Sequence, residues 1–129
     1  MELATCSAVE IAGAIGRGEA SAVEITRSVL DRIAERDGGT NAYLYVDREG
    51  ALAQAAQVDA ARAAGQNPGP LAGVPVGIKD NLCTRGVPTT CASKILARYI
   101  PPYDAHVVSL VRAAGGVVIG KLNLDEFAM

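Results

Sequence analysis

Two short runs of β-branched residues with a helical pattern between them constrain the fold of this chain most. Residues 74–78 (Val-Pro-Val-Gly-Ile) and 117–119 (Val-Val-Ile) have the composition of buried strands. The intervening helical pattern begins at Asp104 and stops at Gly115-Gly116. Strand, crossover helix and strand form a βαβ unit, so the two strands should be parallel and close neighbours. The sequence therefore predicts an α/β fold in which both strands end at the same edge of the sheet.

Two S-x-x-E patterns predict helix starts at Ser7 and Ser21. In such a capping box the serine hydroxyl accepts a hydrogen bond from the third helical amide, and the glutamate accepts one from the serine amide. The second helix carries apolar residues at helical spacing and should end at Gly38-Gly39, with a turn at residues 16–20 between the two helices. The charges along the second helix fit a solvent-exposed face.

A short strand is expected at residues 41–47, which include two tyrosines, a leucine and a valine. Asp47 then caps an alanine-rich helix that extends to about Ala64. Residues 65–70 are rich in glycine and proline and form a loop of ordinary length within a domain. These elements predict helices packed on a sheet in one domain.

The composition supports this architecture and excludes several functions. Of the 129 residues 50% are hydrophobic, but only 4% are aromatic, which favours helices on a sheet over an all-β sandwich. A net charge of −2 provides no basic stripe for a phosphate backbone, so direct tRNA binding is not expected. Three cysteines without C-x-x-C spacing argue against a zinc site or a disulfide framework. We find no signal-peptide pattern and no 18-residue apolar run, and we expect a soluble, cytoplasmic protein without membrane contact.

The first strand of the βαβ unit leads directly into Lys79. Burial disfavours the charged form of a lysine, so an amine held among apolar residues can accept a proton. Lysines at strand ends more often extend their ammonium groups into water. The residues downstream decide between these alternatives.

The downstream segments resemble a known family. Lys-Asp-Asn at 79–81 is followed by Thr-Thr-Cys-Ala-Ser at 89–93, Pro-Pro-Tyr-Asp-Ala at 101–105 and Gly-Lys-Leu-Asn-Leu-Asp-Glu-Phe-Ala-Met at 120–129. This order resembles the amidase signature family over almost the whole chain and, within it, the A subunits of the glutamyl-tRNA(Gln)/aspartyl-tRNA(Asn) amidotransferases. The resemblance implies the N-terminal part of an α/β/α amidase-signature fold with a mixed central sheet.

Members of this family use a Ser-Ser-Lys triad, in which the lysine works through a middle serine to activate a nucleophilic serine. Lys79 matches the family's lysine and is the expected catalytic residue. Both family serines belong to a Gly/Ser-rich segment, which residues 1–129 do not contain. We therefore expect residues 1–129 to be the N-terminal portion of a single amidase domain, truncated before that segment. Such a portion should be inactive alone, with Lys79 open to solvent, an unpaired sheet edge and exposed apolar faces.

The resemblance further implies that the whole protein hydrolyses glutamine. The ammonia would convert Glu-tRNA(Gln) or Asp-tRNA(Asn) to Gln-tRNA(Gln) or Asn-tRNA(Asn). The implied partners are subunits B and C of the amidotransferase, with tRNA reached indirectly through the partner. No cofactor is expected on this chain, because ATP and Mg²⁺ are used by the partner subunit. Two alternatives stay open: another amidase signature hydrolase of small amides, or a non-catalytic fragment.

Several polar residues near these motifs have structural explanations. Asp80 and Asn81 are expected to cap the turn after the strand or to hydrogen-bond the active-site loop. Thr89, Thr90 and Ser93 resemble a family loop near the site, but hydroxyls in loops most often satisfy backbone groups. We assign none of these residues to the triad.

Other motifs do not predict sites. His106 has no cysteine or paired carboxylate nearby in sequence, so a metal site is not expected. Gly120-Lys121 fails the P-loop pattern because Leu122 follows where serine or threonine is required. Leu122 also departs from the threonine usual in the family. Met129 resembles a methionine that lines the substrate channel in some relatives, but as the last residue it is expected to fray.

Overall fold

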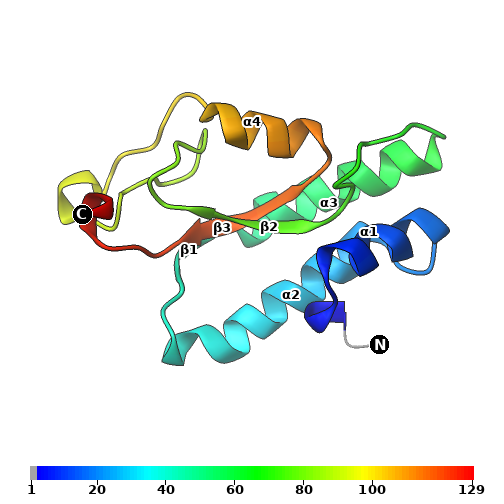
Figure 1. Cartoon of the computed structure of the whole chain (residues 1–129), viewed down its shortest axis with the longest axis horizontal. Coiled ribbons are helices and arrows are strands. Elements are labelled where there is room, and N and C mark those ends of the chain that lie inside the picture. Colours follow the sequence, from blue (N-terminus) through cyan, green and yellow to red (C-terminus); the bar gives the residue numbers. More distant parts are fainter. Residues whose placement is uncertain (1–2) are drawn as a thin grey trace.

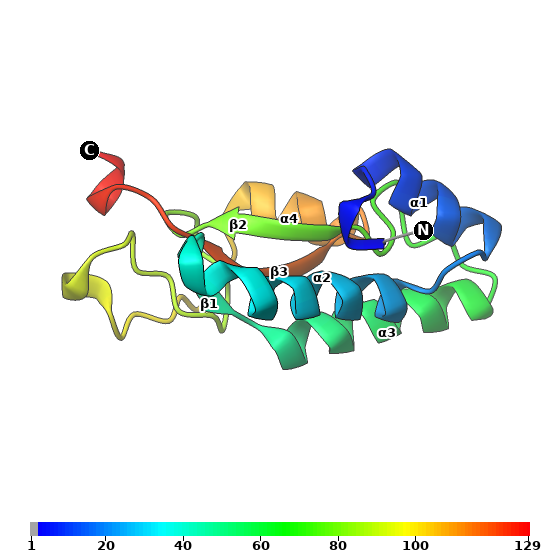
Figure 2. The same cartoon turned by 90° about the horizontal axis from the view of Figure 1, so that it is seen from below.

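The computed structural model describes residues 3–129 as three layers, with a central sheet covered by helices on both faces. One face is covered by α1 (Ala8–Arg17), α2 (Ala22–Arg36) and α3 (Arg48–Ala63), and the other by α4 (His106–Ala113), as Figures 1 and 2 show. Short 3-10 helices lie in the connections and the tail: η1 (Leu3–Thr5), η2 (Asp37–Gly39), η3 (Lys94–Leu96) and η4 (Glu126–Ala128). The predicted α/β/α architecture is confirmed.

The sheet is mixed, with β1 (Tyr43–Val46), β3 (Val117–Leu122) and β2 (Pro75–Lys79) in that spatial order. β2 and β3 are parallel and joined through α4, so the predicted βαβ unit is present, whereas β1 runs antiparallel to β3. β3 extends past the predicted end at residue 119, because both neighbouring strands pair with its second half. Each outer strand leaves one edge unpaired within this sheet.

Gly120 allows β1 to approach β3 closely. A Cβ atom at this position would lie 2.4 Å from the carbonyl oxygen of Tyr45 and 3.1 Å from Cα of Val46. Any larger residue would therefore push the backbone of β1 away from the central strand.

Both predicted capping boxes are present. Ser7 Oγ accepts a hydrogen bond from the Glu10 amide (3.3 Å), and Glu10 Oε2 accepts one from the Ser7 amide (2.7 Å). The same exchange links Ser21 and Glu24 at the start of α2. Local sequence therefore determines where both helices begin.

The cap of α3 also follows the prediction. Asp47 Oδ1 accepts a hydrogen bond from the Gly50 amide at 3.1 Å, and the helix ends at Ala63, next to the predicted end. The predicted end of α2 is close to the observed one, because α2 stops at Arg36 and passes into η2.

Two predicted helix boundaries are wrong. The turn predicted at residues 16–20 begins later, because α1 continues through Arg17 and ends where Gly18 adopts a left-handed φ of 74°. The helix predicted to open at Asp104 begins at His106 instead.

The carboxylate of Asp104 binds outside the first turn of α4. Its Oδ1 accepts a hydrogen bond from the Arg85 amide at 2.7 Å, and its Oδ2 lies 3.2 Å from Nε of Arg112 in the last turn of the helix. Asp104 therefore ties the preceding loop to α4, which its position in the sequence does not reveal.

Two apolar clusters hold the layers together. The larger lies between the sheet and helices α1 to α3, and its buried members are Ile11, Ile15, Ala22, Ile25, Leu30, Ala51, Ala55, Val58, Val74, Val117 and Ile119. The smaller joins Ile78 and Val118 of the sheet to Val108 of α4. Successive residues of β3 thus enter opposite clusters, as the alternation of side chains along a strand requires.

Within residues 3–129, no helix combines the length and the apolar character needed to cross a lipid bilayer.

Candidate active site

The C-terminal ends of β2 and β3 lie side by side at one edge of the sheet. Lys79 and Leu122 are the last residues of their strands and are opposite each other in the register. The Asp80 amide donates to the Leu122 carbonyl at 3.0 Å, which extends the pairing by one step. The Lys79 side chain is exposed, as expected for residues 1–129 alone. The predicted meeting of Lys79 and the tail at one edge is confirmed, and the catalytic role of Lys79 stays a prediction.

A second lysine, Lys121, is buried beside this edge with no exposed surface. Its Nζ donates hydrogen bonds to the Leu82 carbonyl and to Thr89 Oγ1, both at 2.9 Å, and lies 3.2 Å from Asp80 Oδ1. Burial lowers the pKa of Lys121 from its ordinary value, and the Asp80 carboxylate opposes that shift.

Asp80 is also buried and organises the loop that follows Lys79. Its Oδ2 accepts hydrogen bonds from the Thr90 amide (2.9 Å) and the Thr90 hydroxyl (2.5 Å), and its carbonyl accepts one from the Cys91 amide (3.0 Å). Its Oδ1 has no hydrogen-bond donor among residues 3–129, although the Lys121 ammonium lies close to it. Asp80 therefore contacts the loop, one of its two predicted roles.

The loop hydroxyls bind both backbone groups and carboxylates. Thr89 Oγ1 donates to the Val87 carbonyl at 3.2 Å, as expected for a structural hydroxyl. Ser93 Oγ accepts from the Ile95 amide at 3.3 Å but also donates to Glu126 Oε1 at 2.7 Å. The hydroxyls of Thr89 and Ser93 thus bind backbone groups, as predicted, whereas those of Thr90 and Ser93 also bind carboxylates.

The C-terminal tail is bound to the same loop. The Phe127 amide donates to the Cys91 carbonyl at 2.9 Å, in addition to the Ser93–Glu126 contact. In Figures 1 and 2 both segments lie at the left end of the molecule. Cys91 and Ala92 have φ values of 52° and 54°, a left-handed conformation uncommon for residues other than glycine. Backbone strain of this kind is concentrated at functional sites.

A cavity of about 410 Å³ lies between β1 and this loop. It is lined by Leu44, Tyr45, Asp80, Pro88, Thr90, Ala92, Ser93, Lys94 and Ala97. Lys79 is not among the lining residues, so the cavity adjoins the Asp80–Thr90 contact rather than the exposed amine.

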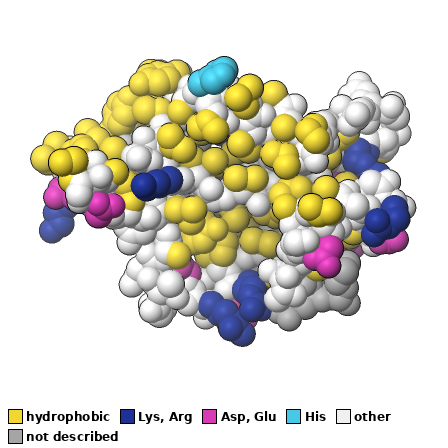
Figure 3. Space-filling model, in the orientation of Figure 1, with side chains coloured by type: hydrophobic (Ala, Val, Ile, Leu, Met, Phe, Trp, Pro, Cys, Tyr) yellow, Lys and Arg dark blue, Asp and Glu magenta, His cyan; other side chains and the backbone are white. Residues whose placement is uncertain are grey.

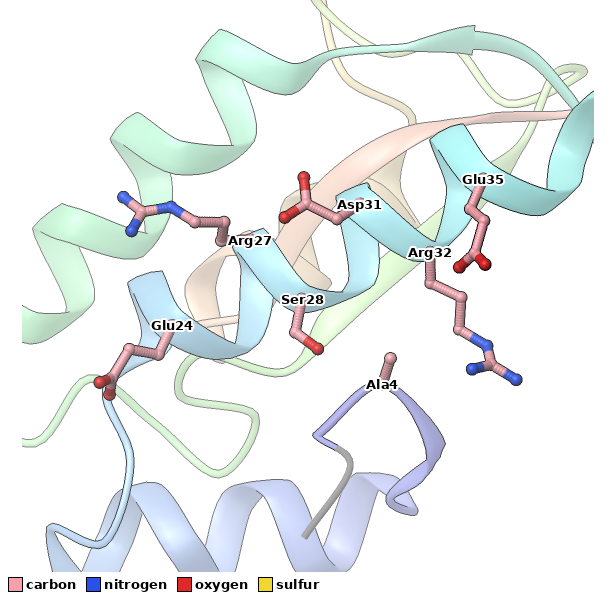
Figure 4. Close-up of a pocket in the computed structure, with 7 residues that line it drawn as sticks. All are labelled: Ala4, Glu24, Arg27, Ser28, Asp31, Arg32 and Glu35. Carbon is pink, nitrogen blue, oxygen red and sulfur yellow. The ribbon is translucent and has the colours of Figure 1, made fainter.

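A larger hollow, of about 450 Å³, lies on the outer surface of α2 (Figure 4). It is lined by Ala4 of η1 and by Glu24, Arg27, Ser28, Asp31, Arg32 and Glu35 of α2. Acidic and basic side chains alternate there, and Asp31 forms an exposed ion pair with Arg48 of α3 at 2.6 Å. These charges fit the predicted solvent-exposed face of α2 and do not suggest a site.

Residues 3–129 contain no group of three side chains placed to bind a metal ion. His106 is exposed at the start of α4, and Met129 is 95% exposed at the end of the tail. Asn81 is also exposed, so of the two polar residues after Lys79 the buried one is Asp80.

Sequence reasoning missed the importance of Lys121, which it considered only as part of a P-loop pattern. The missed signal is its position: the lysine closely follows the apolar run at residues 117–119, with only Gly120 between them. Because β3 is the central strand, flanked by strands on both sides, its residues are buried as far as Lys121.

The chain is similar to known amidases. A family model described as Amidase matches residues 24–129. The chain is 58% identical over 128 residues to the A subunit of glutamyl-tRNA(Gln) amidotransferase from Salinispora tropica, which is 99% of this chain and 26% of that protein. It is 54% identical over 129 residues to the protein of the same name from Moorella thermoacetica, which is 100% of this chain and again 26% of that protein. The solved structure of native peptide amidase from Stenotrophomonas maltophilia matches with a TM-score of 0.90 at 32% identity, over 95% of this chain and 26% of that one.

The chain spans about a quarter of the length of these relatives. The region matched by the family model includes β2, the loop after Lys79, β3 and the tail, which are the segments that meet at the sheet edge. Because that model covers most of the sequence, the chain belongs to the amidase family.

Proposed function

We propose that this chain is part of an amidase that hydrolyses glutamine and that Lys79 is its catalytic base. The proposal rests most on one observation: Lys79 is exposed at the carboxyl ends of two parallel strands. Ligands of open α/β sheets bind at that edge. The loop at 82–93 and the tail at 123–129 converge on the same edge, which supports a site there.

The proposed reaction needs two serines besides Lys79. One serine Oγ attacks the amide carbon of glutamine, while its proton passes through the second serine to the Lys79 amine. The C–N bond then breaks, ammonia leaves with that proton, and water hydrolyses the acyl-enzyme to glutamate. The serines would come from the part of the relatives' length that this chain does not span.

The names of the relatives extend the proposal to tRNA. The ammonia would convert Glu-tRNA(Gln) or Asp-tRNA(Asn) to the amidated form, in a cytoplasmic complex with subunits B and C. ATP and Mg²⁺ would be used by the partner subunit. The net charge of −2 is in keeping with tRNA contact through a partner rather than through this chain.

The second candidate is a hydrolase of small amides or peptide amides without tRNA. The close structural match to a peptide amidase supports it. Sequence identity favours the amidotransferase, because it is 58% to the Salinispora tropica protein and 32% to the peptide amidase.

A chimera tests the role of Lys79. Residues 1–129 replace the matching quarter of the Salinispora tropica protein, which is produced with its partner subunits, and ammonia release from glutamine is measured. We expect Lys79→Ala to lower kcat by at least about 10³-fold, the usual effect of losing a triad member. Arg27→Ala, which removes one exposed positive charge from α2, is the matched control and should leave kcat unchanged. Full activity of the Lys79→Ala chimera would refute the proposal.

The same assay on the 129-residue chain by itself shows whether this chain is active alone or is a non-catalytic fragment. We expect no ammonia release above that of its Lys79→Ala variant, because the amine has no serine pair to activate. Turnover well above that control would show that the chain supplies its own nucleophile.

A further inference from the structure

Lys121 occupies a place where an apolar side chain is expected. It lies in the central strand and has no exposed surface. Removing an ammonium group from water is unfavourable unless protein groups replace the lost water contacts. Of its three N–H groups, two donate hydrogen bonds to Leu82 and Thr89, and the carboxylate of Asp80 lies 3.2 Å from Nζ.

All three partners belong to the segment that directly follows Lys79. Asp80 is the next residue, Leu82 lies in the turn after it, and Thr89 lies on the far side of the loop. Lys121 therefore links the start of this loop, at Asp80 and Leu82, and its far side, at Thr89, to the central strand.

Asp80 carries these contacts further along the loop. Its carboxylate binds the amide and the hydroxyl of Thr90, and its carbonyl binds the Cys91 amide. We call Lys121, Asp80, Thr89 and Thr90 the Lys121 network; all but the half-buried Thr90 are buried. Its members come from β3, the end of β2 and the loop, so it joins three segments at the edge where Lys79 lies.

A buried ion pair is often no more stabilising than apolar residues of the same volume. The ion pair here acts instead on the conformation of the loop. An apolar residue at position 121 would leave the Leu82 carbonyl, the Thr89 hydroxyl and the Asp80 carboxylate without their shared partner. The loop would then lose contacts that hold it in one conformation.

We propose that Lys121 is a positioning residue for Lys79. By neutralising Asp80 and binding the loop, it fixes the direction in which the chain leaves β2 and so the place of the Lys79 amine relative to the substrate. Lys121 does not touch the reacting atoms. The catalytic part of this inference rests on the proposed function, whereas the fixing of the loop does not.

Amide hydrogen exchange on the 129-residue chain tests the fixing of the loop. The measured quantity is the exchange rate of the Thr90 and Cys91 amides divided by that of the Ala55 amide in α3. The variants are Lys121→Met, which leaves the Asp80 carboxylate buried without its cation, and Lys121→Met with Asp80→Asn, which leaves a neutral pair. Leu30→Ala in the larger core cluster is the control for general destabilisation.

We expect the rate ratio to rise at least about tenfold in Lys121→Met and to return to within about threefold of wild type in the double variant. The return is expected because asparagine keeps an oxygen for the Thr90 donors. Leu30→Ala should not raise the ratio. An equal rate ratio in Lys121→Met and Leu30→Ala would overturn the inference. A rate ratio in the double variant as high as that of Lys121→Met would overturn it too. If Lys121→Met does not fold, Asp80→Asn alone serves as the single variant.

Kinetics of the chimera test the positioning role. Misplacement of a catalytic group by about an ångström can lower a rate about 10²-fold. We expect Lys121→Met to lower kcat by about that factor with KM within about twofold, and the double variant to recover most of kcat. Unchanged kcat in Lys121→Met, in a chimera that Lys79→Ala inactivates, would reject the positioning role while leaving the proposed function intact. Loss of the Lys79 effect would instead reject the proposed function.

Discussion

The carboxylate of Asp80 and the ammonium of Lys121 lie 3.2 Å apart, with side chains that are 1% and 0% exposed. Neither charge can be solvated in the folded chain, so each depends on the other and on the loop groups around them. Lys79 and Lys121 thus lie on neighbouring strands, with Lys79 exposed and Lys121 buried.

Lys121→Met should destabilise the chain by about 3–5 kcal/mol, the usual effect of removing one partner of a buried ion pair. The remaining carboxylate of Asp80 would be buried without a cation. The double variant with Asp80→Asn should recover most of the loss. Urea unfolding followed by circular dichroism measures both effects. A double variant less stable than Lys121→Met would contradict this explanation.

The free energy of unfolding should depend on pH through the ionisation of Lys121. Its pKa in the folded chain is lowered by burial, so between that value and the ordinary value of 10.5 the unfolded chain binds more protons than the folded one. The contribution of Lys121 to the unfolding free energy therefore rises as pH increases through this window, by at most about 1.4 kcal/mol per pH unit, and is lost as pH falls.

The check is the difference in unfolding free energy between wild type and the neutral double variant, measured from pH 7 to pH 10. The two proteins share every other ionisable group, so the difference isolates the effect of the Lys121–Asp80 pair. The difference should move in favour of wild type as pH increases. Movement in the opposite direction would mean that the attraction of Asp80 outweighs burial and raises the pKa.

Gly120→Ala should destabilise the sheet by about 1–3 kcal/mol, the usual range for overpacking. The new Cβ would meet the Tyr45 carbonyl oxygen at 2.4 Å, so β1 must move away from β3. Gly16→Ala is the matched control, because Gly16 is an exposed residue of α1 with open space around its Cβ position. It should stabilise the chain by about 0.5–1 kcal/mol. Thermal unfolding of both variants compares them, and a neutral Gly120→Ala would show that β1 is not held closely.

The chain should self-associate through its exposed apolar surface. Hydrophobic side chains spread across the middle of the face shown in Figure 3, and α4 carries Val107 and Leu110 with 46% and 55% of their surface exposed. Leu110→Glu should weaken association by about tenfold or more, since a buried leucine contributes about 1.5–3 kcal/mol.

Gln57→Glu on the exposed side of α3 makes the same change in net charge and should leave association unchanged. Sedimentation velocity over a concentration series measures the effect. A wild-type chain that stays monomeric at all concentrations would disprove the prediction.

The sequence by itself determined the parts of this protein that depend on neighbouring residues. The capping boxes at Ser7 and Ser21 and the cap at Asp47 act within one helical turn, so their spacing is visible in the sequence. The βαβ unit follows from two apolar runs and the helical pattern between them, and its handedness and strand direction follow from general rules. Together these local patterns are enough to place Lys79 at the edge of the sheet.

Only the tertiary structure decided which polar groups are buried together. Lys121 contacts Leu82 and Thr89, which lie 39 and 32 residues away along the chain, and no local pattern encodes such distances. Asp104 likewise does not cap the helix beside it. Folding brings the Arg85 amide and the Arg112 guanidinium next to its half-buried carboxylate, which binds them instead. Burial of a charge depends on which strand becomes central, and that is settled when β1 and β2 pair with β3 from distant parts of the sequence.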